Sequence, residues 1–309
     1  MDPHTRTVTY TGTLAAAAVK VAANLGVHAT DPVILADGAN VIVHLNPAPV
    51  VAKVAASTPA VRPDNAAWLR RELDVVRFLD GRGIPVMTPS PEVPPVVHHG
   101  DGQVMSFWRY LSPAGQERPA EATIGSMLRD LHAELRSYPA QLPLLAPLRD
   151  IPAFLARPQT RLTDGQAAAL TAAHARLTAR LDHARDQSLH GDAGAGNLMA
   201  TAAGWVWHDF EDTCTGPVAW DLAASTASPR LDGPRILAAY GEPVDPAQLE
   251  VCQQLRKLHL TVRYNLYAER LPGLRPRSAR LLAQWPAPWP YPARPAARPG
   301  LRPPGLTWQ

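Results

Sequence analysis

The chain has 309 residues, of which 46% are hydrophobic and 18% are charged. This composition fits a soluble globular protein long enough for two lobes and excludes an intrinsically disordered chain. Cys214 and Cys252 lie far apart and form neither a disulfide framework nor a zinc pattern. The N-terminal apolar run is short for a signal peptide, and no stretch approaches the roughly 20 apolar residues of a membrane span. We therefore expect a cytoplasmic protein with no membrane partner.

The positive charge is concentrated at the C-terminal end. The formal net charge is +3, and seven arginines but no acidic residue follow Glu269. Without these arginines the net charge of +3 becomes −4, so the body of the chain is mildly acidic. An acidic body argues against a nucleic-acid-binding fold, and we expect no nucleic acid partner.

Residues 1–105 predict an antiparallel sheet with one helix inserted after its third strand. A first helix is expected at 14–27, and strands at 33–35, 41–45 and 50–54 alternate with turns. Residues 64–80 have helical apolar spacing and begin with an N-cap, Asp64 or Asn65. Two further strands are expected around the turn at 99–102.

From about residue 120 the pattern is helical, interrupted by two short stretches that each read as a loop joined to a strand. Helices are predicted at these ranges: 122–135, 165–186, 219–226, 233–240 and 246–270. The ten prolines from 272 onward exclude long helices there. We predict an α+β chain with an N-lobe (1–105), a hinge (106–111), a helical C-lobe (112–271) and a tail or strap (272–309).

A lysine and a glutamate in the first lobe form a candidate ion pair. Lys53 lies in the apolar segment VVAKVA, and a buried ammonium needs an anionic partner. Glu72 lies at the edge of the apolar face of helix 64–80, from which it could point toward the lysine. Each residue taken alone is also compatible with an ordinary exposed position.

The stretch HGDAGAGN places Asp192 five residues before Asn197. In phosphoryl transfer an aspartate orients the acceptor hydroxyl, and an asparagine five residues later can bind Mg²⁺. Asp209 follows the apolar WVW and could supply another oxygen ligand, as could Glu211. A surface turn and a strand-end cap are the alternatives, and for Asp212 we expect only a cap or a solvated side chain.

These motifs occur in a known order. His190-Gly191-Asp192 with Asn197, Asp209-Phe210-Glu211, Asp221-Leu222-Ala223 and Leu131-His132 resemble the aminoglycoside phosphotransferase and choline kinase superfamily, whose fold is that of protein kinases. The resemblance runs from about residue 30 to 270. It implies an ATP-dependent, Mg²⁺-assisted phosphotransferase, and leaves GTP open as the nucleotide.

The resemblance also implies residue roles. Asp192 acts as base or orients the hydroxyl, His190 positions the loop, and Asp221 braces it through hydrogen bonds. The implied metal ligands are Asn197, Asp209 and Glu211. Lys53 pairs with the nucleotide phosphates and with Glu72. The turn formed by Asp37, Gly38, Ala39 and Asn40 covers the phosphates in place of a glycine-rich loop, and the hinge residues Phe107, Trp108, Arg109 and Tyr110 receive adenine.

The acceptor is less well defined by the sequence. The resemblance implies an aminoglycoside-type antibiotic as the acceptor. However, residues 249–270 hold two glutamates against four lysines and arginines, which is not an obvious binding site for a polyamine. A Ser/Thr kinase for precursor peptides of modified natural products is the alternative, and a nucleotide-binding pseudokinase scaffold is a third. Antibiotic resistance and natural product biosynthesis are both compatible with these acceptors.

Overall fold

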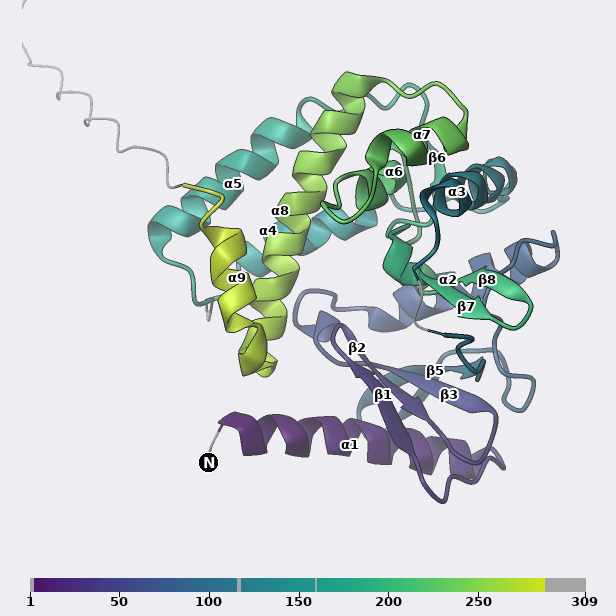
Figure 1. The fold of residues 1–309 in the computed structure, drawn as a ribbon. Helices are drawn as coiled ribbons and strands as arrows, with labels where there is room; N and C mark the ends of the chain where they lie inside the picture. The colour runs from purple at the N-terminus through teal and green to yellow at the C-terminus, as the bar shows by residue number, and fades with distance from the viewer. Residues whose placement is uncertain (1–2, 116–117, 159, 287–309) are drawn as a thin grey trace, which may run out of the picture.

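The computed structural model describes residues 3–115, 118–158 and 160–286, which form two lobes (Figure 1). The helices are α1 (Pro3–Asn24), α2 (Asn65–Asp80), α3 (Glu121–Leu135), α4 (Asp150–Leu155), α5 (Asp164–Thr178), α6 (Val218–Thr226), α7 (Gly233–Tyr240), α8 (Pro246–Arg270) and α9 (Arg275–Leu282). The strands are β1 (Val33–Asp37), β2 (Asn40–His44), β3 (Val50–Ala55), β4 (His98–Gly100), β5 (Gln103–Arg109), β6 (Gln187–Leu189), β7 (Leu198–Thr201), β8 (Gly204–Trp207) and β9 (Cys214–Gly216).

The N-terminal lobe is built on an antiparallel sheet with the strand order β1-β2-β3-β5-β4. Every residue of β3 is buried, because helices cover both faces of the sheet. Val50, Ala52 and Val54 pack in the core beneath α1, whereas Val51 packs with α2. Since side chains alternate along a strand, Lys53 shares the α2 face with Val51.

Helix α1 begins earlier than the prediction of 14–27. It starts at Pro3 and places Leu14, Ala17, Ala18 and Ala22 against the sheet (Figure 1). The residues before Leu14 are rich in threonine and lack an apolar helical pattern, so their propensity gave no helical signal. The alanines allow the helix to approach the sheet closely.

The C-terminal lobe is organised around α8, against which α4, α5, α6 and α9 pack (Figure 1). Helix α5 ends at Thr178, shorter than the predicted 165–186. The backbone of Asp182 instead exchanges two hydrogen bonds with the side chain of Gln248 on α8. This tertiary contact holds the following residues out of the helix.

The start of the predicted tail is folded. Residues 272–274 form a short 3₁₀ turn, and α9 packs against α8, with Trp285 Nε1 donating to Thr261 Oγ1 at 3.0 Å. Pro272 and Pro276 are compatible with this because each lies in the first turn of a helical segment. The rest of the predicted tail, residues 287–309, lies outside the described residues.

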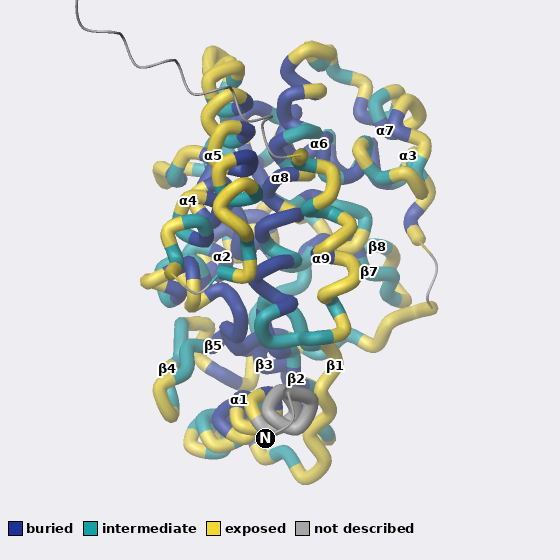
Figure 2. The backbone as a smooth tube through the Cα atoms, turned by 90° about the vertical axis from the view of Figure 1, so that its left-hand side faces the viewer, coloured by how far each residue is buried: buried dark blue, intermediate teal, exposed yellow. Residues whose placement is uncertain are grey.

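One hydrophobic core joins the lobes. Val75, Val76 and Leu79 of α2 belong to the same buried cluster as Leu255 and Leu258 of α8. Figure 2 shows the buried backbone continuing from the sheet into α8, with exposed residues at the periphery. Among the described residues, no helix combines the length and apolarity needed to cross a membrane.

Helices α3 and α7 approach each other at Gly125. A Cβ at this position would lie 2.4 Å from the carbonyl oxygen of Ile236 and 2.7 Å from Ala239 Cβ. We predict that Gly125→Ala lowers the free energy of unfolding by about 1–3 kcal/mol, because the backbone of α7 cannot move aside cheaply.

Gly12→Ala is the control, since nothing lies within 4 Å of a Cβ at Gly12 on α1. There the alanine should raise the free energy of unfolding by about 0.5–1 kcal/mol. Urea denaturation measures both changes. Equal stability of Gly125→Ala and the wild type would show that the close approach is wrong.

Candidate active site

A cavity of about 650 Å³ lies between the lobes. It is lined by β1, β2 and β3, the end of β5, the loop before β7, and α8. Most of the residues predicted from the sequence line it: Asp37, Gly38, Ala39, Asn40, Lys53, Glu72, Trp108, Arg109, Tyr110, Asp192, Asn197 and Asp209. Residues distant in sequence thus meet at one site, while Phe107, His190 and Glu211 do not line it.

Lys53 lies at the centre of a cluster of carboxylates. Its Nζ contacts both carboxylate oxygens of Glu72 at 2.9 Å, Asp209 Oδ1 at 2.5 Å and Glu211 Oε2 at 3.1 Å. Burial disfavours the charged lysine, but the three carboxylates outweigh burial and raise its pKa well above the ordinary value. The ammonium therefore stays charged and connects the N-terminal lobe to the segment after β8.

Asp221 holds the loop that carries Asp192, as predicted. Its carboxylate accepts the backbone N–H groups of His190 at 2.8 Å and Gly191 at 2.9 Å. Gly191 has φ +86°, and a Cβ there would lie 1.8 Å from the carbonyl oxygen of Asp212. Only glycine fits this crossing of two chain segments.

Two arginines of α8 bind the carboxylate of Asp192. Arg256 Nη2 contacts Oδ1, and Arg263 Nη1 contacts Oδ2 at 3.1 Å. Burial would raise the pKa of Asp192, but the two guanidinium groups hold it below the ordinary value. These contacts of Asp192 with α8 were not predicted from the sequence. The spacing of the two arginines by seven residues, two helical turns, was the available signal because it places both on one face of α8.

Asn197 and Asp209 offer oxygen atoms to the cavity. The Asn197 amide nitrogen donates to the Asp192 carbonyl oxygen at 2.7 Å, so the amide oxygen is the atom that can act as a ligand. Asp209 keeps 31% of its side chain exposed. Within the described ranges no cluster of three His, Cys, Asp or Glu residues could hold a metal by itself. One carboxylate and one amide oxygen suit Mg²⁺, which retains waters and binds substrate phosphates.

Glu211, which was predicted as a metal ligand, does not line the cavity and is held by other side chains. Asn40 Nδ2 donates to its Oε2 at 2.7 Å, Lys53 contacts the same oxygen, and Arg62 lies 3.5 Å from its Oε1. Asp209 has a left-handed backbone, φ 65°, and the 3₁₀ turn of residues 210–212 follows it. Glu211 and Asp209 therefore both contact Lys53 Nζ, but only Asp209 lines the cavity.

Phe107 and His190 also lie outside the cavity. The side chain of Phe107 packs in the core beneath α1, and its carbonyl oxygen accepts the Ser90 N–H at 3.1 Å. The predicted adenine contact at Phe107 is therefore not supported by this geometry. His190 is fully buried, with Nε2 3.1 Å from the His208 carbonyl oxygen and its ring 4.2 Å from that of Phe210. This position suits the predicted positioning role of His190.

The turn between β1 and β2 is fastened to the C-terminal lobe. Arg270, at the end of α8, donates to the Gly38 carbonyl oxygen at 2.7 Å and lies 2.5 Å from Asp37 Oδ1. Ser57 also donates to the Gly38 carbonyl oxygen, at 2.8 Å. The turn predicted to cover the nucleotide phosphates thus has a defined position above the cavity.

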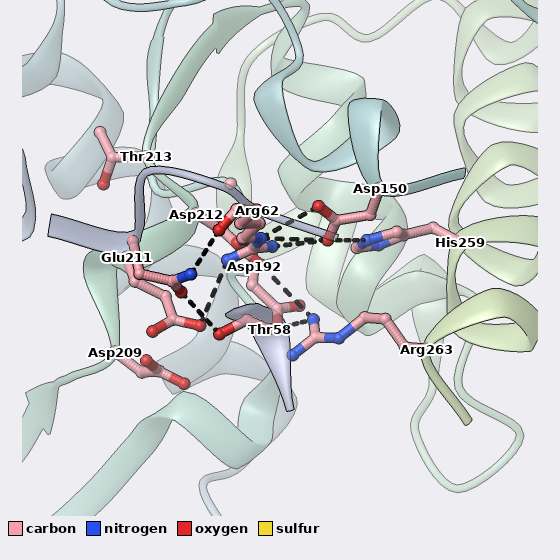
Figure 3. A network of polar contacts seen from close by, with 12 residues as sticks. Thr58, Arg62, Asp150, Asp192, Asp209, Glu211, Asp212, Thr213, His259 and Arg263 are labelled. Carbon is pink, nitrogen blue, oxygen red and sulfur yellow. Dashed lines mark hydrogen bonds and ion pairs between the residues drawn. The ribbon is translucent and has the colours of Figure 1, made fainter. Parts of the chain in front are cut away.

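A buried ion network lies beside the cavity (Figure 3). Arg62, from the loop before α2, contacts Asp150 Oδ2 and Asp212 Oδ1, each at 2.7 Å. Asp212 also lies 3.4 Å from Arg263, and His259 lies 3.4 Å from Asp150. The prediction of a cap or solvated side chain for Asp212 is wrong, because the fold brings two arginines to it. Such distant partners leave no local sequence pattern.

The sequence profile of the phosphotransferase enzyme family matches residues 35–252. The chain belongs to this family. It is therefore a phosphotransferase, and its acceptor group is a hydroxyl, as predicted from the motifs around Asp192 and Asp209. No curated protein matches the sequence.

Solved structures show that this phosphotransferase has the predicted protein-kinase-like α+β fold. A microcompartment-associated aminopropanol kinase matches with a TM-score of 0.60 and 17% identity, covering 86% of this chain and 95% of that one. The amicoumacin kinase hAmiN in complex with AMP-PNP, Ca²⁺ and Ami has a TM-score of 0.59, 13% identity and coverage of 83% and 89%. The GDP and kanamycin complex of APH(2")-IIia has a TM-score of 0.56, 17% identity and coverage of 86% and 94%.

The ion network should make the stability of the phosphotransferase depend on pH. Burial would raise the pKa of Asp150, but Arg62 and His259 together lower it below the ordinary value. Its ionised form therefore stabilises the fold above the unfolded pKa of about 3.9, and this contribution is lost as the pH falls toward the folded pKa. At pH 7, Asp150→Asn should lower the free energy of unfolding by about 3–5 kcal/mol.

Urea denaturation between pH 7 and pH 3 tests this expectation. The difference in the free energy of unfolding between the wild type and Asp150→Asn should become smaller as the pH falls toward 3. Asp74→Asn is the control, because the Asp74–Arg77 pair is exposed and contributes about 1 kcal/mol or less. If the wild type and Asp150→Asn are equally stable at pH 7, or if the difference in their free energy of unfolding grows in acid, Asp150 does not stabilise the fold as an ionised group.

Proposed function

We propose that the chain transfers the γ-phosphate of ATP, with Mg²⁺, to a hydroxyl of a small molecule. The observation that carries this proposal is the single cavity that unites the Lys53–Glu72 pair with Asp192, Asn197 and Asp209. The nucleotide lies between the N-lobe (1–105) and the C-lobe (112–271), next to the hinge (106–111). A cytoplasmic location fits the use of ATP.

In this proposal Lys53 binds the α- and β-phosphates. Its contacts with Glu72 from α2 hold the ammonium in place, because two oxygens at 2.9 Å restrict its position. Asn197 and Asp209 hold Mg²⁺, which neutralises phosphate charge when it is bound. The turn of residues 37–40, held by Ser57 and Arg270, covers the phosphates with backbone groups.

We place the contact with adenine at the last residue of the predicted hinge. The backbone N–H of Arg109 donates to Thr88 and that of Tyr110 donates to Pro49, at 3.0 Å and 2.9 Å. Leu111 follows directly and lines the cavity. We therefore assign the adenine-binding N–H to Leu111, with Trp108 and Tyr110 forming the apolar walls.

Asp192 orients the acceptor hydroxyl and accepts its proton. Its loop is held by Asp221, by the bond of 2.8 Å from Trp220 Nε1 to the Gly191 carbonyl oxygen, and by Asn197. A fixed carboxylate beside the phosphate site reduces the cost of aligning the hydroxyl for in-line attack. The complete set of Lys53, Asp192, Asn197 and Asp209 favours an enzyme over a pseudokinase scaffold.

The nucleotide and acceptor are the finer parts of the proposal. Similar structures carry AMP-PNP with Ca²⁺ in one case and GDP in another, so GTP is the alternative donor to ATP. For the acceptor, both an aminoglycoside-type antibiotic and a precursor peptide stay predictions. The corresponding roles of the enzyme, in antibiotic resistance or in natural product biosynthesis, stay predictions as well. The cavity of about 650 Å³ favours a small molecule over a folded protein substrate.

Asp192→Asn tests the proposed role of Asp192. We expect ATP turnover in the presence of Mg²⁺ to fall by about 10²–10⁴-fold, because the amide cannot accept the hydroxyl proton. The affinity for ATP should change little, since Asp192 acts on the acceptor. Steady-state kinetics and calorimetry measure the two quantities.

Asp74→Asn serves as the matched control for this experiment. It makes the same change at an exposed position of α2 outside the cavity, and its turnover should equal that of the wild type. If Asp192→Asn turns over ATP as fast as this control, Asp192 does not take part in the reaction.

A further inference from the structure

The acceptor end of the cavity is formed by Asp192 together with Arg263 and Tyr267 of α8. Nearby carboxylates are already paired with cations. Asp192 is bound by Arg256 and Arg263, and Asp212 lies between Arg62 and Arg263. A positively charged acceptor would therefore have to displace an arginine to reach a carboxylate.

The two arginines of α8 differ in how firmly they are held. Arg256 donates to the Gly191 carbonyl oxygen at 2.9 Å and lies 4.9 Å from the centre of the Trp220 ring, besides contacting Asp192. These contacts fasten it to the backbone of the Asp192 loop, and it does not line the cavity. Arg256 therefore has a structural task.

Arg263 lines the cavity and keeps 16% of its side chain exposed. Its Nε donates to the Tyr267 hydroxyl at 2.8 Å, whereas Nη1 contacts Asp192 at 3.1 Å and Asp212 at 3.4 Å. Tyr267 thus fixes the near end of the guanidinium group. The far end holds two longer contacts that an incoming anion can replace (Figure 3).

We propose that the acceptor carries an oxyanion, either a carboxylate or a phosphate group, and that Arg263 binds this group. This inference rests on the proposed function. A guanidinium group presents parallel N–H donors that match the two oxygens of either group. When Arg263 turns to this anion, Asp192 Oδ2 loses a partner and can accept the acceptor hydroxyl instead. Binding of an acceptor that carries an oxyanion is therefore coupled to release of the Asp192 carboxylate from Arg263.

The geometry also limits where the hydroxyl lies on the acceptor. Arg263 Nη1 is only 3.1 Å from Asp192 Oδ2. Because Tyr267 keeps the guanidinium group near Asp192 after this contact is replaced, an oxyanion on Arg263 and a hydroxyl on Asp192 are separated by a few covalent bonds. A polycation is disfavoured at the same place, because its ammonium groups would face Arg263 and leave a like-charge contact.

Four three-carbon compounds that share two adjacent hydroxyl groups test this proposal. Glycerate and glycerol 3-phosphate carry the two oxyanions, glycerol is neutral, and 3-amino-1,2-propanediol carries an ammonium group. Calorimetry measures the Kd of each for the full chain with Mg²⁺ and AMP-PNP. The Kd of at least one oxyanion should be lower than that of glycerol and of the amine by a factor of about ten or more, as expected for hydrogen bonds to a charged group.

The variant Arg263→Gln should remove this preference. Arg180→Gln is the control, because it deletes an arginine charge from an exposed position outside the cavity, and it should keep the preference. The comparison of the four compounds on the wild type stands even if Arg263→Gln fails to fold. The tighter of the two oxyanions tells whether carboxylate or phosphate is the preferred group.

Three results would overturn the proposal: equal or tighter binding of glycerol or the amine, no measurable binding of either oxyanion, or an unchanged preference in folded Arg263→Gln. Phosphorylation of the four compounds and ATP turnover are measured in parallel with ATP. If the wild type exceeds Asp192→Asn in turnover while the oxyanion preference is absent, only the inference about Arg263 fails. If wild-type turnover equals that of Asp192→Asn, the proposed function fails.

Discussion

The contact of Lys53 with three carboxylates is the interaction on which the site depends. Glu72 comes from α2 of the N-terminal lobe, whereas Asp209 and Glu211 come from the segment after β8. A buried ammonium is unfavourable unless anions surround it, so the fold must bring these segments together. The same requirement places Lys53 beside Asp209, where a nucleotide and its metal ion would be bound.

Charge pairing also shapes the acceptor end. Arg62 joins the loop before α2 to Asp150 and Asp212, and α8 supplies the arginines that hold Asp192. These pairs leave few carboxylates available for a cationic ligand. Under the proposed function, a change at Arg263 of α8 can alter the acceptor preference while the proposed phosphate contact of Lys53 is kept.

The sequence predicted the residues whose partners follow from local patterns. The apolar segment around Lys53, the helical spacing around Glu72 and the spacing of Asp192 to Asn197 all correspond to the observed positions. The contacts of Arg263 with Asp192 and of Arg62 with Asp150 and Asp212 were not predictable in this way, because the partners lie more than 50 residues apart. The contacts of Glu211 with Asn40 and Arg62 were not predictable for the same reason, since these partners are also distant in sequence.

The Mg²⁺ dependence of ATP affinity tests most directly whether Asp209, beside Lys53, holds the metal ion. Calorimetric titration of ATP with and without Mg²⁺ should show a large gain of affinity with the metal for the wild type. For Asp209→Asn most of this gain should be lost, because a neutral amide is a poorer ligand for Mg²⁺ than a carboxylate. An equal gain for both proteins would contradict the assignment of the site.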